Sequence, residues 1–156
     1  PQLYDVLDVV GRRFQEVFSQ LFGGGTAQIV LTDPDNILTG GIDFYIQPPG
    51  KKRQQLTLLS GGERALTVIA LLFSFLDYRP APFCVLDEVD AALDEANVER
   101  FSSYLNRVNK ETQFIVVSHR KKTMEAAEVL QGVTMVERGV SRLLTVAFED
   151  VKEDLA

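Results

Sequence analysis

The sequence predicts an α/β domain with a largely parallel core sheet, flanked by helices and carrying antiparallel hairpins at its edge. Residues 83–86 and 114–117 are continuous apolar runs, which are typical of parallel strands buried on both faces. A helical pattern separates the two runs, and strands that alternate with helices favour a parallel sheet. The chain has 156 residues, of which 46% are hydrophobic, so it can bury the core of one domain.

The first 22 residues predict a helix with a narrow apolar seam. Gaps of four and three residues alternate along this seam, which is the heptad pattern, at Leu3, Leu7, Val10, Phe14, Val17 and Leu21. Two interpretations follow: the end of a coiled coil, or an amphipathic helix that packs on its own domain. Three glycines at 23–25 then end the helix, so we separate residues 1–22 from a domain at 23–156.

Two strands and a long helix come next. Residues 27–32 and 41–47 alternate apolar and polar side chains, and the turn residues between them favour an antiparallel pair. We interpret the basic cluster at 51–53 as a solvated turn. The following helix is expected to begin near Gly61 and to end at about Tyr78, because two prolines come directly after it.

The second half of the chain completes the α/β pattern. A helix is expected over residues 95–109, between the two apolar strands, and another over 121–130. Residues 133–148 predict a closing hairpin that turns at Gly139.

Composition and charge argue against several classes of protein. The net charge of −6 disfavours a free-standing nucleic-acid binder, because phosphate contacts need clustered Lys and Arg. Cys84 is the single cysteine, which leaves no internal disulfide and favours a reducing cytosol. The apolar stretch at 65–76 is shorter than the ~20 residues of a membrane span. Since the sequence starts at Pro1 without a signal peptide, we expect an internal segment of a longer protein.

The start of the long helix carries the first candidate site. Ser60 and Glu63 have the spacing of a capping box, in which each side chain bonds the backbone N–H of the other residue. Capping does not explain Gly61 and Gly62, since a glycine costs about 1 kcal/mol relative to alanine inside a helix. A glycine pair at a helix N-terminus leaves bare N–H groups that can bind phosphate.

Acidic residues end the first apolar strand. Asp87 and Glu88 are adjacent, and their mutual repulsion is costly unless a cation or a proton-accepting role uses them. A carboxylate at a strand's C-terminal end is where Mg²⁺ binds in nucleotide sites. The alternative is that the two acids only begin the next loop.

The second apolar strand ends in Ser118 and His119. His119 is the only histidine in the sequence. If the two strands are neighbours, it lies at the same sheet edge as Asp87 and Glu88. A lone histidine is more often incidental than catalytic, and its position favours a functional role without establishing one.

In this order the features resemble the ABC-type ATPases. LSGGE at 59–63 resembles their signature motif, FCVLDE at 83–88 their Walker B motif, and VDAALD at 89–94 their D-loop, while Ser118-His119 matches the switch histidine. PAPFCVLDEVDAALDEANVERF and SHRKKTMEAAEVLQGVTM resemble the structural maintenance of chromosomes (SMC) family, particularly its bacterial condensin branch. The resemblance covers the whole chain as the C-terminal lobe of an ATPase head, with residues 1–22 as a coiled-coil root helix.

The sequence contains no G-x-x-x-x-G-K-[ST] phosphate loop. In the resembled family this loop lies in an N-terminal lobe, and two assembled heads sandwich two ATP molecules. The resemblance therefore implies ATP and Mg²⁺ as cofactors. It also implies four partners: the N-terminal lobe, a second head in a homodimer, a kleisin subunit, and DNA through the full complex. The isolated fragment is expected to be inactive.

The resemblance also implies roles for single residues. Asp87 would hold Mg²⁺ through water, Glu88 would orient and deprotonate the attacking water, and His119 would contact the γ-phosphate. Asp90 would couple the two sites across the dimer. The residues that would act in trans, on ATP bound to the opposing head, belong to the signature motif: Ser60, Gly61 and Gly62.

By the same resemblance, the complete protein would hydrolyse ATP to drive chromosome condensation and segregation, in the cytoplasm and in association with the nucleoid. One alternative is another ATPase head, from a DNA-repair SMC-like protein or a transporter. Transport ATPases usually have Pro-Thr or Pro-Ser where this chain has Val89-Asp90, which counts against the transporter. The other alternative is a kleisin-binding platform without independent ATPase activity, with the closing hairpin as its candidate surface.

Overall fold

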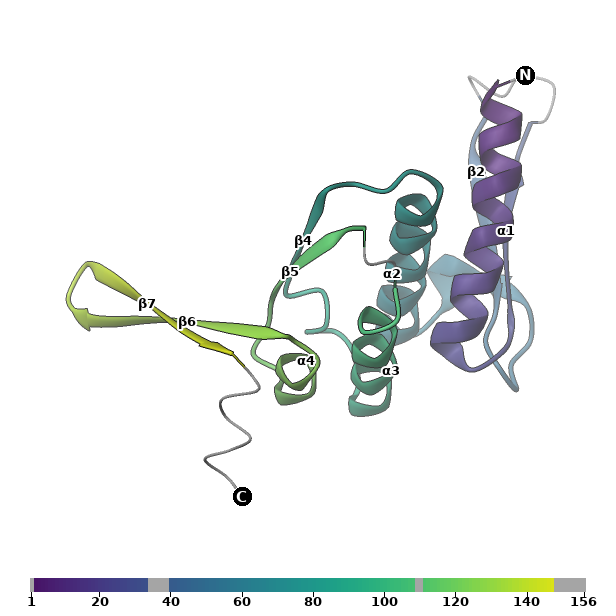
Figure 1. Ribbon diagram of the computed structural model, residues 1–156. Helices are drawn as coiled ribbons and strands as arrows, with labels where there is room; N and C mark the ends of the chain where they lie inside the picture. Colours follow the sequence, from purple (N-terminus) through teal and green to yellow (C-terminus); the bar gives the residue numbers. More distant parts are fainter. Residues whose placement is uncertain (1, 34–39, 109–110, 148–156) are drawn as a thin grey trace.

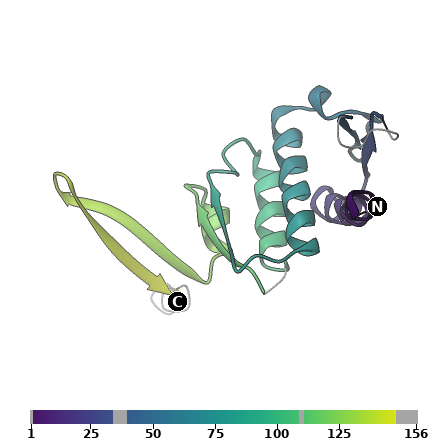
Figure 2. The same ribbon diagram turned by 90° about the horizontal axis from the view of Figure 1, so that it is seen from above.

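The computed structural model describes residues 2–33, 40–108 and 111–147 (Figure 1). Its elements lie in successive layers. A small antiparallel sheet packs on helix α1, which packs on helices α2 and α3, and these cover a two-stranded parallel sheet. A long hairpin extends from the far side of that sheet (Figure 2). The structure confirms the predicted α/β class, although its parallel sheet has only two strands within the described ranges.

Helix α1 (Gln2–Phe22) packs on its own domain along most of its length. The buried side chains are 4% exposed or less: Val10, Phe14, Val17, Phe18, Leu21 and Phe22. The seam from Val10 onward therefore packs on the domain itself. The helix ends in three glycines, and Gly25 is required there because an added Cβ would lie 2.3 Å from the carbonyl oxygen of Gln47.

The antiparallel sheet packs on α1 with one face. Strand β1 (Thr26–Leu31) pairs with β2 (Ile42–Gln47), and β2 pairs with β3 (Gln54–Gln55). The predicted antiparallel pair is thus confirmed, whereas β3 and the short 3₁₀ helix η1 (Leu56–Leu58) were not predicted. Residues 34–39 of the predicted turn lie outside the described residues.

The centre of the core lies between α2 (Gly61–Tyr78) and α3 (Glu95–Leu105). The bounds of α2 are those predicted. Phe73 of α2 is fully buried, and its ring contacts three aromatic rings on other elements: Phe101, Tyr104 and Phe114. Helix α3 ends four residues before its predicted end, and Asn109 lies outside the described residues.

Strands β4 (Phe83–Asp87) and β5 (Gln113–Val117) are parallel, as predicted. The prediction that both faces are buried is wrong. The helices cover only the face that carries Leu86, which is 2% exposed. The other face exposes 47–58% of each of its apolar side chains: Phe83, Val85, Ile115 and Val117.

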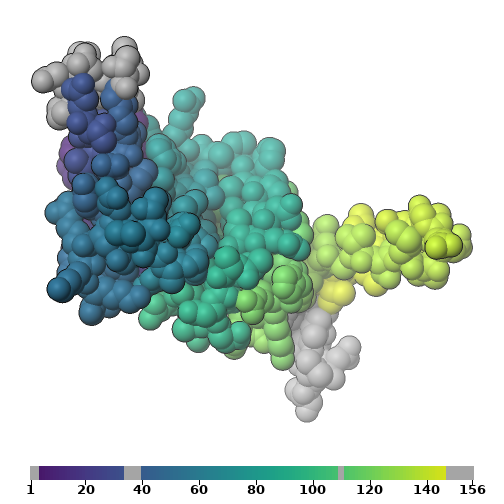
Figure 3. All heavy atoms as spheres, turned by 180° about the vertical axis from the view of Figure 1, so that it is seen from behind, coloured from purple at the N-terminus to yellow at the C-terminus, as the bar shows by residue number. Residues whose placement is uncertain are grey.

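The C-terminal part of the described chain differs most from the prediction. The expected helix at 121–130 is only α4 (Lys121–Glu125), because residues from Val129 onward pair in a hairpin instead. Strand β6 (Val129–Glu137) turns at Gly139, as predicted, into β7 (Val140–Ala147). The predicted last strand residue, Phe148, lies outside the described residues. The hairpin protrudes from the body of the molecule (Figure 3) and exposes apolar side chains on both faces.

None of the described helices combines the length and the hydropathy needed to cross a bilayer.

Candidate functional site

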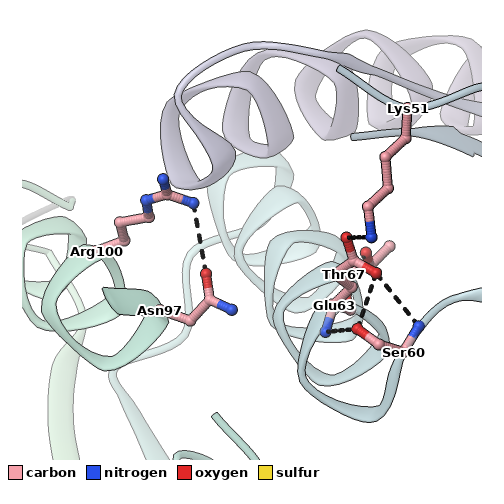
Figure 4. Close-up of polar contacts among 6 residues, drawn as sticks. All are labelled: Lys51, Ser60, Glu63, Thr67, Asn97 and Arg100. Carbon is pink, nitrogen blue, oxygen red and sulfur yellow. Dashed lines mark hydrogen bonds and ion pairs between the residues drawn. The ribbon is translucent and has the colours of Figure 1, made fainter. Parts of the chain in front are cut away.

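The N-terminus of α2 carries the predicted capping box (Figure 4). The Ser60 hydroxyl accepts a hydrogen bond from the Glu63 backbone N–H at 3.4 Å. In return, the Glu63 Oε2 atom accepts from the Ser60 backbone N–H at 3.2 Å and from the Ser60 hydroxyl at 2.8 Å. Three reciprocal bonds therefore fix the side chain of Ser60 at the start of the helix.

Lys51 reaches this capping box from the turn that precedes β3. Its Nζ atom lies 2.8 Å from Glu63 Oε1, the carboxylate oxygen that Ser60 leaves free. Burial alone would raise the pKa of Glu63, but the hydrogen bonds from Lys51 and Ser60 together lower that pKa below its ordinary value. Lys51, Lys52 and Arg53 are all exposed, which confirms the predicted solvated turn, and the ion pair of Lys51 with Glu63 adds a contact that was not predicted.

The two glycines of the motif have different surroundings. A Cβ added to Gly61 would meet no atom within 4 Å, so the space beside it is open. A Cβ added to Gly62 would lie 3.3 Å from the carbonyl oxygen of Ala92. The close approach of Ala92 therefore favours a glycine at 62, which capping left unexplained, whereas nothing in the described residues requires a glycine at 61.

The parallel pairing brings Asp87, Glu88 and His119 to one sheet edge. Asp87 pairs in register with Val117, and the Glu88 backbone N–H donates to the Val117 carbonyl oxygen at 2.9 Å. Glu88 adopts a φ of 49°, a left-handed conformation that is costly for a residue other than glycine and is common at functional sites. Both carboxylates and the imidazole are exposed, so they are open to a ligand.

Asp90 lies inside the domain instead of facing outward. Its side chain is fully buried, and its Oδ2 atom accepts hydrogen bonds from the hydroxyls of Ser118 and Thr123, both at 2.5 Å. Sequence reasoning missed this role for both hydroxyl residues. A buried carboxylate requires hydrogen-bond donors, and the hydroxyl residues on either side of His119, Ser118 and Thr123, were the signal in the sequence that could have predicted this contact.

A shallow groove joins the signature motif to the strand end. It has a volume of about 380 Å³ and is lined by residues of α2 and by one residue after β4: Gly61, Arg64, Ala65, Val68, Ile69 and Val89. The groove, together with the contact between Gly62 and Ala92, places the signature motif next to the segment that follows the two carboxylates.

Asp87 and Glu88 can bind a cation whose other ligands are water and substrate phosphates. Within the described ranges, no three His, Cys, Asp or Glu side chains come together as a metal site. Asp87 and Glu88 are exposed and adjacent, whereas Asp90 is engaged with two hydroxyls. Mg²⁺ fits such a pair, because it is usually held by one or two carboxylates, with water and substrate phosphates as its other ligands.

Comparison with known proteins identifies relatives along almost the whole chain. The model of the family described as "RecF/RecN/SMC N terminal domain" matches residues 28–142. The chain is 60% identical over 149 residues to the Chromosome partition protein Smc of Bacillus subtilis and 56% identical over 147 residues to that of Lactiplantibacillus plantarum. These matches cover 96% and 94% of this chain but only 13% and 12% of the relatives.

Solved structures share the fold. A chain from work on ATP-driven dimerization and DNA stimulated activation of SMC ATPases superposes with a TM-score of 0.87 at 35% identity, covering 98% of this chain and 92% of that one. An Smc head bound to the C-winged helix domain of ScpA gives 0.86 at 36% identity, covering 96% of this chain and 46% of that one. An SMC head domain from Thermotoga maritima gives 0.72 at 42% identity, with coverages of 93% and 51%. The fold is that of the SMC ATPase heads.

Proposed function

The chain belongs to the RecF/RecN/SMC N terminal domain family, and from this premise we propose that it is the C-terminal lobe of an SMC ATPase head. The lobe pairs with an N-terminal lobe to bind and hydrolyse ATP in a head–head dimer. The complete protein acts in chromosome condensation and segregation, in the cytoplasm with the nucleoid. The observation that carries the proposal is the single sheet edge that brings Asp87 and Glu88 beside His119.

At this edge each side chain has a distinct task. Asp87 would hold Mg²⁺, which would supply positive charge to neutralise the phosphates. Glu88 orients the attacking water and accepts its proton, which requires an exposed carboxylate such as the one found there. His119 donates a hydrogen bond to the γ-phosphate. Because both strand ends share one hydrogen-bonded edge, the three groups can act on one nucleotide.

The signature motif acts on the nucleotide of the opposing head. Ser60 presents its hydroxyl at the start of α2, where the positive end of the helix dipole favours phosphate. Gly61 leaves open space beside the backbone, so a phosphate can approach its N–H group closely. Phosphate approach therefore explains the glycine at 61, as the contact with Ala92 explains the glycine at 62.

An N-terminal lobe covers the exposed face of the parallel sheet. That face carries four apolar side chains that are 47–58% exposed, and apolar surface of this kind favours a protein partner. The sequence lacks a phosphate loop, so the partner lobe also supplies the cradle for the triphosphate. On its own the chain is inactive. Residues 1–22 form the root of the coiled-coil arm, and residues 23–156 form the lobe.

The β6–β7 hairpin favours a second role, as the platform for a kleisin subunit. It protrudes from the body and exposes apolar side chains that no described element covers, among them Val133, Val136 and Leu143, at 67–70%. A related Smc head binds the C-winged helix domain of ScpA. Pull-down of a kleisin C-terminal domain without nucleotide tests this role, and Val136→Asp should abolish capture while leaving ATP-dependent head dimerisation intact.

The ATPase role is tested on the chain co-expressed with its N-terminal lobe. Glu88→Gln should keep ATP binding, slow hydrolysis about 100-fold or more, and accumulate head dimers. Ser60→Arg should block dimerisation while each head still binds ATP. Glu99→Gln, an exposed glutamate on α3, is the matched control and should behave as wild type. Normal hydrolysis by the Glu88→Gln head would exclude Glu88 as the base.

A further inference from the structure

Asp90 is a buried carboxylate whose Oδ2 atom is hydrogen-bonded, whereas its Oδ1 atom has no hydrogen-bond partner among the described residues. Burying a carboxylate costs several kcal/mol unless hydrogen bonds offset the lost hydration. Two hydroxyl donors, Ser118 and Thr123, converge on its Oδ2 atom at 2.5 Å. Packing alone does not require an acid here, since a well-packed apolar group often serves stability as well as a buried charge. The carboxylate therefore calls for a role in positioning.

The hydroxyl of Ser118 connects Asp90 to the backbone on both sides of His119. It donates to Asp90 and accepts a hydrogen bond from the Arg120 backbone N–H at 3.0 Å. The residues on both sides of His119 are thus tied to one carboxylate. His119 itself has an exposed side chain, so its place depends on this backbone support.

Further bonds connect the same two segments at their ends. The Glu88 backbone N–H donates to Val117, and the Arg120 guanidinium donates to the Leu93 carbonyl oxygen at 2.7 Å. Segment 88–93, which begins with Glu88, is therefore hydrogen-bonded at both ends to segment 117–123, which carries His119. The first of these segments also meets the signature helix, because the carbonyl oxygen of Ala92 lies against Gly62.

We propose that Asp90 is a positioning residue, which fixes His119 through the hydroxyl of Ser118 to the segment that carries Glu88 and contacts Gly62. The inference rests on the proposed function for the role of His119. It gives Asp90 a task inside one head, distinct from a direct contact across the dimer, for which its buried side chain is not available. A shift of segment 88–93 moves His119 with it.

The first test is a double-mutant cycle on ATP hydrolysis by the full-length protein. Ser118→Ala should lower kcat about tenfold, the effect of one lost charge-assisted hydrogen bond, with KM little changed. Ser118→Thr keeps the hydroxyl and should restore most of the rate. In a His119→Gln background, Ser118→Ala should have no further effect. Ser103→Ala, an exposed serine on α3, is the control.

Two results of the cycle would overturn the inference. One is an unchanged kcat in Ser118→Ala when His119→Gln lowers it, and the other is multiplication of the two losses in the double variant. In either case Ser118 does not act through His119. If Ser118→Ala fails to fold, Thr123→Val removes the other hydroxyl donor to Asp90 and takes its place in the same cycle.

The second test does not depend on ATPase activity. Hydrogen exchange of the peptide that spans residues 117–121 should be about tenfold faster in Asp90→Asn and in Ser118→Ala, because the Arg120 amide loses its anchored acceptor. Unchanged exchange in both variants overturns the positioning role. If His119→Gln hydrolyses ATP normally, the proposed role of His119 fails, and the exchange result still decides whether Asp90 holds this loop.

Discussion

Gly62 lies directly against Ala92: a Cβ added to the glycine would be 3.3 Å from the alanine's carbonyl oxygen. This contact joins the first turn of α2 to the loop that follows the acidic strand end. The two glycines of the motif are therefore not equivalent, since the space beside Gly61 is open.

The glycine pair yields a matched comparison. Gly62→Ala should be less favourable for stability than Gly61→Ala by about 1 kcal/mol or more, because the carbonyl oxygen of Ala92 must move by a few tenths of an ångström to admit the methyl group. Gly61→Ala should be neutral or slightly stabilising, since alanine is the better helix former. Urea titration of the assembled head measures both. If Gly61→Ala folds normally yet loses ATP-dependent dimerisation, the phosphate contact proposed for Gly61 is supported. Equal stability of the two variants would contradict the packing argument.

Phe73 should be the most sensitive single position on α2. It is fully buried between α3 and β5, where its ring meets Phe114 edge-on at 5.7 Å between centroids. Phe73→Ala should cost about 3–5 kcal/mol, through the lost burial and the cavity that remains. Phe75→Ala is the control on the same helix, because Phe75 is 47% exposed, and it should cost less than about 1 kcal/mol. Similar losses of unfolding free energy in Phe73→Ala and Phe75→Ala would show that Phe73 is not at the centre of the core.

The ion pair between Lys51 and Glu63 predicts a pH dependence. The folded pKa of Glu63 is lowered, so its contribution to stability is complete above the unfolded pKa and is lost as the pH falls through the lower, folded pKa. Lys51→Met should raise the pKa of Glu63. At pH 7 it should reduce the free energy of unfolding by less than about 1 kcal/mol, because half-exposed Lys51 is screened by solvent.

The difference between wild type and Lys51→Met should shrink as the pH falls through the lowered folded pKa of Glu63, since protonation of Glu63 removes the pair in both proteins. Carboxyl NMR measures the pKa, and urea titrations at pH 7 and pH 3 measure the stabilities. Lys52→Met removes the same charge from the exposed neighbouring position and is the control. An unchanged Glu63 pKa in Lys51→Met would show that the pair does not persist in solution.

The exposed face of the parallel sheet predicts where the N-terminal lobe binds. Val85→Thr and Ile115→Thr should each weaken binding of that lobe about tenfold, because each removes apolar surface that the interface would bury. Calorimetric titration measures the affinity. Val136→Thr, at an exposed position on the β6–β7 hairpin, is the control and should bind the lobe normally. Wild-type affinity of both sheet variants would place the interface on another surface.

Local signals were enough to predict several elements. The bounds of α2 were correct because a capping box starts the helix and two prolines follow it, and both signals act within a few residues. The antiparallel pairing of β1 with β2 and the parallel pairing of β4 with β5 followed from the alternation and order of apolar runs. The shared edge of Asp87 and Glu88 with Ser118 and His119 followed from that order as well.

The errors have long-range causes. The predicted helix at 121–130 stops at Glu125, because Val129 and Leu130 pair with Ala147 and Val146 in the hairpin. The ion pair between Lys51 and Glu63 was not predicted, because the two residues are twelve positions apart and on different elements. A spacing pattern carries no information about such pairings.

The sequence by itself determined the α/β class, the order of the strands and the residues that meet at the sheet edge, because hydrophobic periodicity and capping are local. Only the tertiary structure decided that one face of the parallel sheet is open, that Gly62 packs against Ala92, and that Asp90 points inward to Ser118 and Thr123. These outcomes depend on which distant surfaces meet, and burial and hydrogen-bond geometry, unlike periodicity, are set by the whole fold.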